Sequence, residues 1–191
     1  MNKKILSILL ITSSLFATQN LSQKECAYKN NDTIKVTWTA FKTPMKLGVG
    51  GTFDSVTFAK SQNGTKDLKS LLLNSSVKID TKSVNSNNKT RDQKLVKSFF
   101  DLMKNETILA KIVDIDDKTV TIKLTMNDIT KDIPLRYSYE DGKLKASGVI
   151  DLFDFQASKA LSSINKACYE LHKGKTWNDV TIGFEIAIEC K

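Results

Sequence analysis

Apolar and polar residues alternate along much of the chain. The clearest stretch runs from Val180 to Ile188, where nearly every second residue is a large aliphatic or aromatic one. A period of two places these side chains on one face of a β-strand, so each such stretch predicts a strand with one buried face. The strands predicted from this pattern and from β-rich composition are 34–40, 49–59, 76–80, 107–115, 119–126, 133–139, 143–152 and 180–188.

Two segments have helical spacing instead. Thr90 begins a capping box, with Gln at the third position after it, which predicts a helix over 90–103. Apolar residues three or four positions apart predict a second, amphipathic helix over 154–172. The Lys173-Gly174 pair that follows is typical of a helix C-terminus. A short apolar piece over 68–73 lies between strands.

Eight strands with short connections predict a mainly β fold. The Asp116-Asp117 and Asp141-Gly142 pairs are turn-forming, which favours hairpins and therefore antiparallel pairing. Closing the sheet on itself removes its exposed edges. We therefore predict an eight-stranded antiparallel, lipocalin-like β-barrel with two helices, one of which covers the barrel. The interior of such a barrel holds side chains or one elongated ligand.

The N-terminus has the three parts of a secretory signal peptide. A basic start (Met1–Lys4) precedes an apolar stretch (Ile5–Phe16) and the small residue Ala17. The apolar stretch of about 12 residues is shorter than the roughly 20 that span a bilayer. We expect residues 1–17 to be removed, leaving a single domain over 18–191 that is exported to the periplasm without a stable membrane anchor.

The chain is basic, but its basic residues argue against nucleic acid as a partner. Of 191 residues, 29 are Lys or Arg and 21 are Asp or Glu, which gives a formal charge of +8. Only Arg91 and Arg136 are arginines, whereas base readout and phosphate clamping depend on the planar guanidinium. A spread of lysines is typical of a solubilising surface.

Little in the chain indicates catalysis, a metal or a cofactor. The three cysteines and the single His172 do not have metal-ligand spacing. His172 falls at a predicted helix end, where a cation faces the negative end of the helix dipole. Asp114, Asp116 and Asp117 cluster, but at a predicted turn, where turn formation is the simpler explanation. We predict no catalytic residues and no cofactor.

Several short segments, in their order along the chain, resemble the YceI-like family. The segments that carry the resemblance are Trp38–Lys42, Leu47–Phe53, Val77–Asp80, Ser83-Val84, Arg91-Asp92, Phe99–Asp101, Gly148–Asp151, Phe153–Phe155, Trp177 and Val180–Ile188. The family consists of exported bacterial lipocalin-like barrels that hold a polyisoprenoid or another long apolar chain. Members commonly carry histidines in the first strand and the loop after it. Here 31–33 and 41–43 contain none, so contacts made by those histidines are not expected.

The resemblance implies a ligand pocket walled by aromatic and aliphatic side chains. The residues we expect on its wall are Trp38, Phe41, Phe53, Phe99, Phe100, Phe153, Phe155, Ile164 and Phe184. Lys42, Lys46 and Arg91 are expected at the pocket mouth, where they would meet a carboxylate or diphosphate head. The alternative is that the apolar set fills the interior as an ordinary core and the cations are solvated, with Arg91 making a contact at the start of its helix.

Three functions remain open at this level. The first is an exported carrier of a long apolar ligand such as a polyisoprenoid, fatty acid or fatty amide. The second is an enzyme acting on such a lipid, and the third is an interaction module with a solid core. The resemblance also leaves pairing into a homodimer open.

The three cysteines allow one disulfide. The first and last strands of a closed barrel are neighbours, so Cys190 is expected beside Cys26. We predict a Cys26–Cys190 bond and a buried thiol at Cys168 on the apolar face of its helix. A Cys26–Cys168 bond is the alternative.

Overall fold

The computed structural model describes residues 27–190, with the exception of the side chains of residues 31, 32 and 190. The predicted signal peptide and Cys26 lie outside the described residues. The strands are β1 (Tyr28–Lys42), β2 (Leu47–Phe53), β3 (Val56–Ala59), β4 (Ser76–Asp80), β5 (Val84–Asn85), β6 (Thr107–Ile115), β7 (Thr119–Met126), β8 (Ile129–Glu140), β9 (Lys143–Asp151) and β10 (Thr176–Cys190). The α-helices are α1 (Leu68–Leu72), α2 (Lys89–Ser98), α3 (Ser158–Ala167) and α4 (Tyr169–His172), and the 3-10 helices are η1 (Thr81–Ser83), η2 (Phe100–Leu102) and η3 (Leu152–Phe155).

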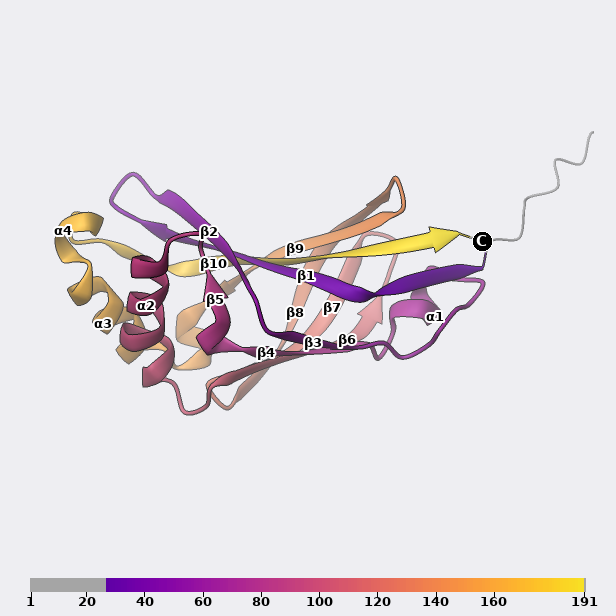
Figure 1. Cartoon of the computed structure of the whole chain (residues 1–191), viewed down its shortest axis with the longest axis horizontal. Coiled ribbons are helices and arrows are strands. Elements are labelled where there is room, and N and C mark those ends of the chain that lie inside the picture. Colours follow the sequence, from indigo (N-terminus) through magenta and orange to yellow (C-terminus); the bar gives the residue numbers. More distant parts are fainter. Residues whose placement is uncertain (1–26, 191) are drawn as a thin grey trace, which may run out of the picture.

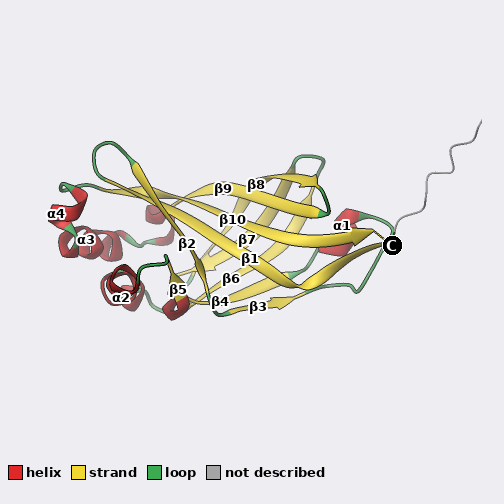
Figure 2. Cartoon of the chain, turned by 45° about the horizontal axis from the view of Figure 1, so that its top comes forward, coloured by secondary structure: helices red, strands yellow, loops and turns green. Residues whose placement is uncertain are grey.

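The strands form one curled antiparallel sheet in the order β3-β4-β6-β7-β8-β9-β10-β1-β2-β5. Figure 1 and Figure 2 show this sheet wrapping around an interior, with β1 and β10 crossing the whole length of the molecule. The first and last strands pair along most of their length, from Tyr28 opposite Cys190 to Lys42 opposite Thr176. The mainly β, lipocalin-like fold and the β1–β10 neighbourhood are therefore confirmed.

The sheet has ten strands, not the predicted eight. The predicted strand 49–59 is divided by a bend at Asp54-Ser55, where both backbone N–H groups donate to Ser83, one to its carbonyl (2.9 Å) and one to its hydroxyl (2.9 Å). The additional strand β5 has only two residues and pairs with the end of β2. Two residues are too few for an alternation pattern to be visible in the sequence.

Hairpins connect the middle of the sheet, as the turn-forming pairs predict. Asp141 and Gly142 both have positive φ (50° and 71°), and Asn127 and Asp128 adopt the same conformation (54° and 63°). Two such residues in succession make the type I′ turn, whose twist matches that of the flanking strands. β7, which the Asn127-Asp128 turn joins to β8, has one buried face. Its buried residues are Val120, Ile122, Leu124 and Met126.

Both longer helices depart in detail from the prediction. α2 is capped by Asn88, whose side-chain oxygen accepts from the Arg91 N–H (3.0 Å), and not by Thr90. The predicted helix over 154–172 consists of η3, α3 and α4, because Gln156 adopts a left-handed conformation (φ 53°) that ends η3. α4 does end at His172, and Lys173 and Gly174 follow in left-handed conformations.

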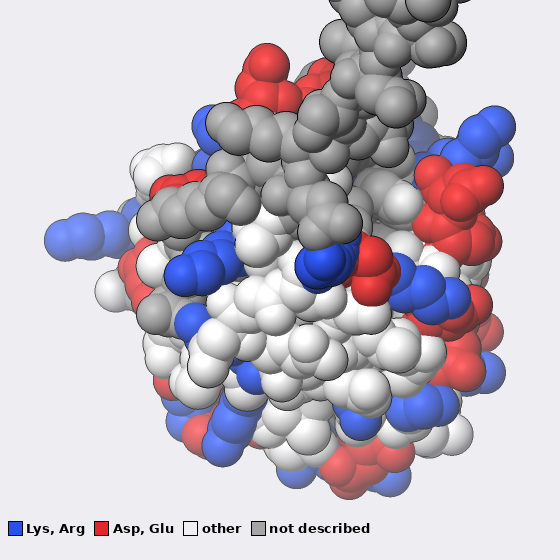
Figure 3. Space-filling model, turned by 90° about the vertical axis from the view of Figure 1, so that its right-hand side faces the viewer, with Lys and Arg blue, Asp and Glu red and all other residues white. Residues whose placement is uncertain are grey.

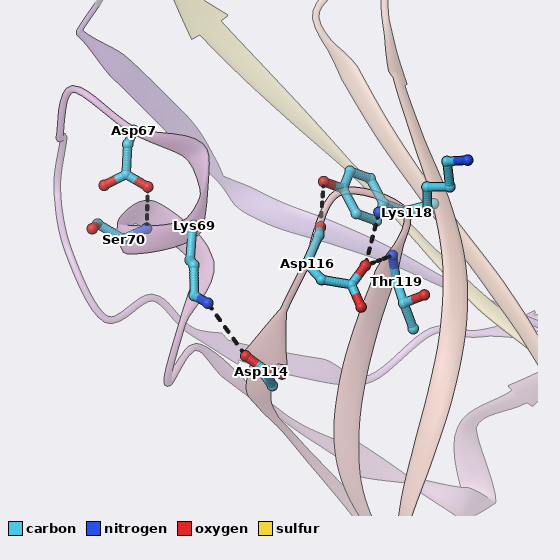
Figure 4. Close-up of polar contacts among 8 residues, drawn as sticks. Asp67, Lys69, Ser70, Asp114, Asp116, Lys118 and Thr119 are labelled. Carbon is cyan, nitrogen blue, oxygen red and sulfur yellow. Dashed lines mark hydrogen bonds and ion pairs between the residues drawn. The ribbon is translucent and has the colours of Figure 1, made fainter.

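α1 closes one end of the curled sheet. Leu71 and Leu72 are completely buried. The Asp67 carboxylate caps the helix by accepting from the Ser70 N–H (2.9 Å), and Lys69 pairs with Asp114 on β6 (3.4 Å), as Figure 4 shows. The hydrogen bonds of its carboxylate with Ser70 hold the pKa of Asp67 below its usual value. This end is thus fixed by packing and by caps.

Asp116 and Asp117 of the acidic cluster lie in the predicted turn at the same end, whereas Asp114 belongs to β6. The Asp116 carboxylate accepts from the backbone N–H groups of Lys118 (2.9 Å) and Thr119 (2.7 Å) (Figure 4). These two bonds lower the pKa of Asp116, because they stabilise its charged form. Figure 3 looks onto this end of the molecule, where lysines and acidic residues are interspersed around the rim.

α2, α3 and α4 gather at the opposite end, together with the β1–β2 connection (Figure 1). The β1–β2 connection is tied to the start of β10, because the Thr43 N–H donates to the Lys175 carbonyl (2.9 Å) and the Trp177 indole N–H donates to the Thr43 carbonyl (2.8 Å). Within residues 27–190, none of the helices has the length and apolar character that crossing a bilayer requires.

Candidate ligand-binding cavity

The inside of the curled sheet is hollow. A cavity of about 490 Å³ runs inside the curled sheet, from the helices at the α2–α4 end to Ser75 and Ile112 beside α1. Strands β1, β2, β4, β6, β7 and β10 contribute to its wall, as do α2, α3 and α4. The volume falls within the range of roughly 300–1,000 Å³ that is common for small-molecule sites.

The cavity wall is built from the inward faces of strands that the alternation pattern predicts. Along β10, Val180, Ile182 and Phe184 face the cavity, and along β1 Val36, Trp38 and Ala40 do so. Seven of the nine residues predicted for the wall line it: Trp38, Phe41, Phe53, Phe99, Phe100, Ile164 and Phe184.

Two predicted wall residues lie elsewhere. Phe153 is 52% exposed and Phe155 is fully buried in the packed core, and neither lines the cavity. The family resemblance implies both as wall residues, but they belong to η3. A 3-10 helix has about three residues per turn, so residues two apart point in different directions. The carbonyl of Phe155 accepts from the buried Asn127 side-chain amide (2.8 Å), which fixes this turn against the core.

The aromatic part of the wall is held rigidly. The rings of Phe53 and Phe99 both meet Phe100 edge-to-face, with centroids 6.1 Å and 5.1 Å apart. The Trp38 indole packs against Gly51 of β2 and donates to the Thr52 carbonyl (3.2 Å). A Cβ at Gly51 would come within 2.5 Å of the Trp38 ring, so this close approach requires glycine.

The cations predicted at the mouth separate into two kinds. Lys42 and Arg91 line the cavity, but Lys46 does not. Lys46 pairs with Asp179 (2.7 Å) and lies over the ring of Trp177 (4.9 Å). Because Asp179 and Trp177 both belong to β10, these contacts make Lys46 hold the β1–β2 connection to β10.

Arg91 makes the helix-start contact that was the alternative explanation for it. Its Nε donates to the Ser86 hydroxyl (2.8 Å) and its Nη2 to the Ser86 carbonyl (3.1 Å). The Asp92 carboxylate accepts from the same serine, from its N–H (2.9 Å) and its hydroxyl. Arg91 thus fixes the chain before α2, while part of its side chain faces the cavity.

Sequence reasoning missed further residues that line the cavity. Lys94 and Leu95 follow Arg91 by three and four positions on α2, a spacing that puts them on the same helix face. His172 and Trp177 lie at the same end, on α4 and β10. The helical spacing from Arg91 is a signal that could have identified Lys94 and Leu95. For His172 the sequence pattern indicates only a helix end.

His172 is held in a defined orientation at the cavity. Its Nδ1 lies 2.7 Å from the Thr176 hydroxyl, which itself donates to the Asn165 side-chain oxygen (2.9 Å). Burial lowers the pKa of His172, and the nearby positive charges of Lys42 and Lys94 lower it further. These three side chains from β1, α2 and α4 therefore share one electrostatic environment.

α2 covers the cavity loosely. None of its residues is fully buried, although Leu95 faces the interior and packs against the core. A helix that closes a filled core buries its apolar stripe completely. The half-buried state of α2 is what we expect when the space beneath it contains no side chains.

A curled antiparallel sheet around an apolar interior, closed at one end and covered by helices at the other, defines the lipocalin-like class of β-barrels. Within that class, the model of the YceI-like domain matches residues 28–188, and the chain belongs to this family. A search of curated proteins gave no match.

Solved structures with the same fold come from several bacteria. A polyisoprenoid-binding domain from Saccharophagus degradans has 12% sequence identity and a TM-score of 0.61, covering 87% of this chain and 99% of that one. BcnA from Burkholderia cenocepacia has 16% identity and a TM-score of 0.54, covering 82% and 96%. The YCEI protein of Campylobacter jejuni has 23% identity and a TM-score of 0.53, covering 74% and 85%.

Proposed function

We propose that this protein is an exported binding protein that holds a long-chain apolar ligand, such as a polyisoprenoid, fatty acid or fatty amide, for transport, storage or scavenging. The observation that carries the proposal is the cavity of about 490 Å³ walled mainly by aliphatic and aromatic side chains. The related domain from Saccharophagus degradans, described as polyisoprenoid-binding, supports the same class of ligand.

Burial of a chain is sufficient for binding. Each buried methylene contributes about 0.8 kcal/mol, so two additional methylenes strengthen binding by roughly tenfold. Affinity is expected to rise in this way with chain length until the cavity is filled. The ligand is then selected mainly by length and shape, as a pocket of this composition implies.

The polar groups around the cavity support holding a ligand over transforming it. The hydroxyl of Thr176 donates to Asn165 and not to His172, so His172 does not act as its general base. Cys168 is a free thiol, but it is buried in the apolar wall. We therefore favour the binding protein over the enzyme that the sequence left as an alternative.

Intrinsic fluorescence tests the proposal directly. The chain has two tryptophans, and both Trp38 and Trp177 line the cavity. Titration with saturated alcohols of increasing length should change their emission, with affinity rising as the chain lengthens. Ala110→Phe should abolish the response, because Ala110 faces the cavity. Ala187→Phe is the matched control, since Ala187 alternates with the buried Ile186 and Ile188 and does not line the cavity.

Export to the periplasm is part of the same proposal. The basic start, apolar stretch and small residue of 1–17 support it. Fractionation of the native host followed by N-terminal sequencing should find the protein in the periplasmic fraction, beginning near Thr18. A chain that keeps residues 1–17 in the cytoplasm would overturn this part of the proposal.

A further inference from the structure

The charged side chains that line the cavity are all basic. Lys42, Arg91 and Lys94 face it, and within the described part of the chain no Asp or Glu does. The guanidinium of Arg91 already donates twice to Ser86. Lys42 and Lys94 make no ion pair with any described residue. Two lysines at this mainly apolar cavity therefore have no negative partner among the described residues.

His172 adds a third nitrogen to this pair. Because the Thr176 hydroxyl donates its proton to Asn165, it can only accept from His172, so Nδ1 of the imidazole carries the hydrogen. The Asn165 amide is oriented by its other end, which donates to the Gly174 carbonyl (3.4 Å). Nε2 is therefore the nitrogen that remains for a ligand. Lys42 lies opposite Thr176 in the β1–β10 pairing, the Thr176 hydroxyl contacts His172, and Lys94 lines the same cavity from α2, so the three groups gather at one end of the cavity.

We propose that Lys42, Lys94 and His172 form a binding site for the anionic head, a carboxylate or a phosphate, of the amphiphile whose chain occupies the cavity. The inference rests on the proposed function and adds the class of head group to it. We name this set of three residues the head-group site.

The chemistry of the three groups fits an anion. The two ammonium groups, each with three donors and no acceptor, hold the anion at neutral pH, and His172 adds an Nε2–H donor only below its lowered pKa. Bonds between charged donors and an oxyanion are shorter and stronger than neutral ones. At the edge of an apolar cavity they are also less screened by solvent than on an open surface. A neutral alcohol or amide gains much less from the same groups.

Three ligands with one chain and different heads test the inference. Dodecanoic acid, dodecyl phosphate and dodecanol are titrated at pH 7.5 and followed by the fluorescence of Trp38 and Trp177. We expect the wild type to bind at least one of the two anions about tenfold more tightly than dodecanol, and the comparison of the two identifies the preferred head. Raising the salt concentration from 50 to 500 mM should weaken anion binding several-fold without weakening dodecanol binding.

The variant Lys42→Met/Lys94→Met keeps the length of both side chains and removes their charge. We expect it to lose about tenfold in anion affinity while dodecanol affinity stays within twofold. Lys118→Met/Lys131→Met is the matched control, because it removes two exposed lysines that do not line the cavity, and it should leave all three affinities unchanged.

Two results would overturn the inference. One is equal binding of the three heads by the wild type, and the other is an anion preference that survives in Lys42→Met/Lys94→Met. The salt dependence of the wild type answers the same question if that variant does not fold. Failure of all three ligands to bind, together with unresponsive longer alcohols, overturns the proposed function itself, which is a different outcome from loss of head selectivity.

Discussion

The two ends of the curled sheet use the same kinds of element in opposite ways. At the α1 end a five-residue helix buries two leucines completely and is fixed by a cap and an ion pair. At the other end α2 is twice as long but has no fully buried residue and lies over a cavity. One end is thus packed solidly, and the other leaves room for a ligand. Curling of the sheet and filling of its interior are separate properties.

The largest expected difference between the two ends is in the stability lost when one leucine at each end is truncated. Leu72→Ala at the α1 end should lower the free energy of unfolding by about 2–5 kcal/mol, because a cavity replaces a fully buried side chain. Leu95→Ala in α2 should cost less than about 1 kcal/mol, because Leu95 is half-buried against space that is already empty. Urea unfolding monitored by circular dichroism measures both. Equal losses would show that α2 is packed as tightly as α1.

The second effect concerns the predicted disulfide. Cys190 pairs with Tyr28, two residues after Cys26, so a Cys26–Cys190 bond would tie the chain close to the bridge between Tyr28 and Thr65 near α1. Non-reducing peptide mapping should recover these two cysteines in one linked pair. Cys190→Ser should then lower the free energy of unfolding by about 2–4 kcal/mol. Cys168 is free and buried in the structure, and a linked peptide containing it would contradict the assignment.

A smaller effect is expected from the cap of α2. Asn88→Ala should destabilise the protein by about 1 kcal/mol, because the Arg91 N–H loses its acceptor. Hydrogen exchange in α2 should accelerate while exchange in β7 stays slow. Thr90→Ala is the control, since Thr90 does not cap the helix in the structure. If Thr90→Ala were the more damaging change, the capping box predicted from the sequence would describe α2 better.

The smallest expected effect is on the pH dependence of stability, which should differ between the titratable groups at the two ends. His172 has a pKa below its usual value of about 6.5, because burial and the two lysines disfavour the imidazolium. The unfolded chain then binds more protons, so stability falls as pH drops through 6.5 and continues to fall until the folded pKa is passed. The lowered pKa values of Asp67 and Asp116 act only near and below about 3.8.

A pH series of unfolding measurements checks this separation. His172→Gln should remove the loss of stability just below pH 6.5 and leave the acid-induced loss in place. The single histidine also gives one readily assigned NMR titration. A His172 pKa above 6.5 would contradict the electrostatic environment described for the head-group site.

Most of the fold can be predicted from the sequence, because each long strand buries one face and therefore alternates apolar and polar residues. The alternation in 119–126 and 180–188 predicts strands whose structure agrees within a few residues, and it places Trp38 and Phe184 on the inward face. The split of the predicted strand 49–59 into β2 and β3 could not be predicted, because the bend depends on hydrogen bonds to Ser83, which is distant in sequence.

The site was less predictable than the fold. Alternation shows which side chains point inward, but not whether they meet and fill the interior. Phe155 illustrates this, because its ring is as apolar as that of Phe99 and yet it belongs to the solid core. The association of Lys42, Lys94 and His172 depends on three elements coming together, and no local pattern links them. The position of Lys46 outside the cavity was unpredictable for the same reason, because its partner Asp179 is far along the chain.

Native mass spectrometry of the protein purified from its own host tests the central claim most directly. The account predicts a mass above that of the mature chain, which returns to the mass of the chain after organic extraction. The extract should contain one class of long apolar molecule with an acidic head. Protein that carries no additional mass before extraction would contradict the account and favour an empty or solid barrel.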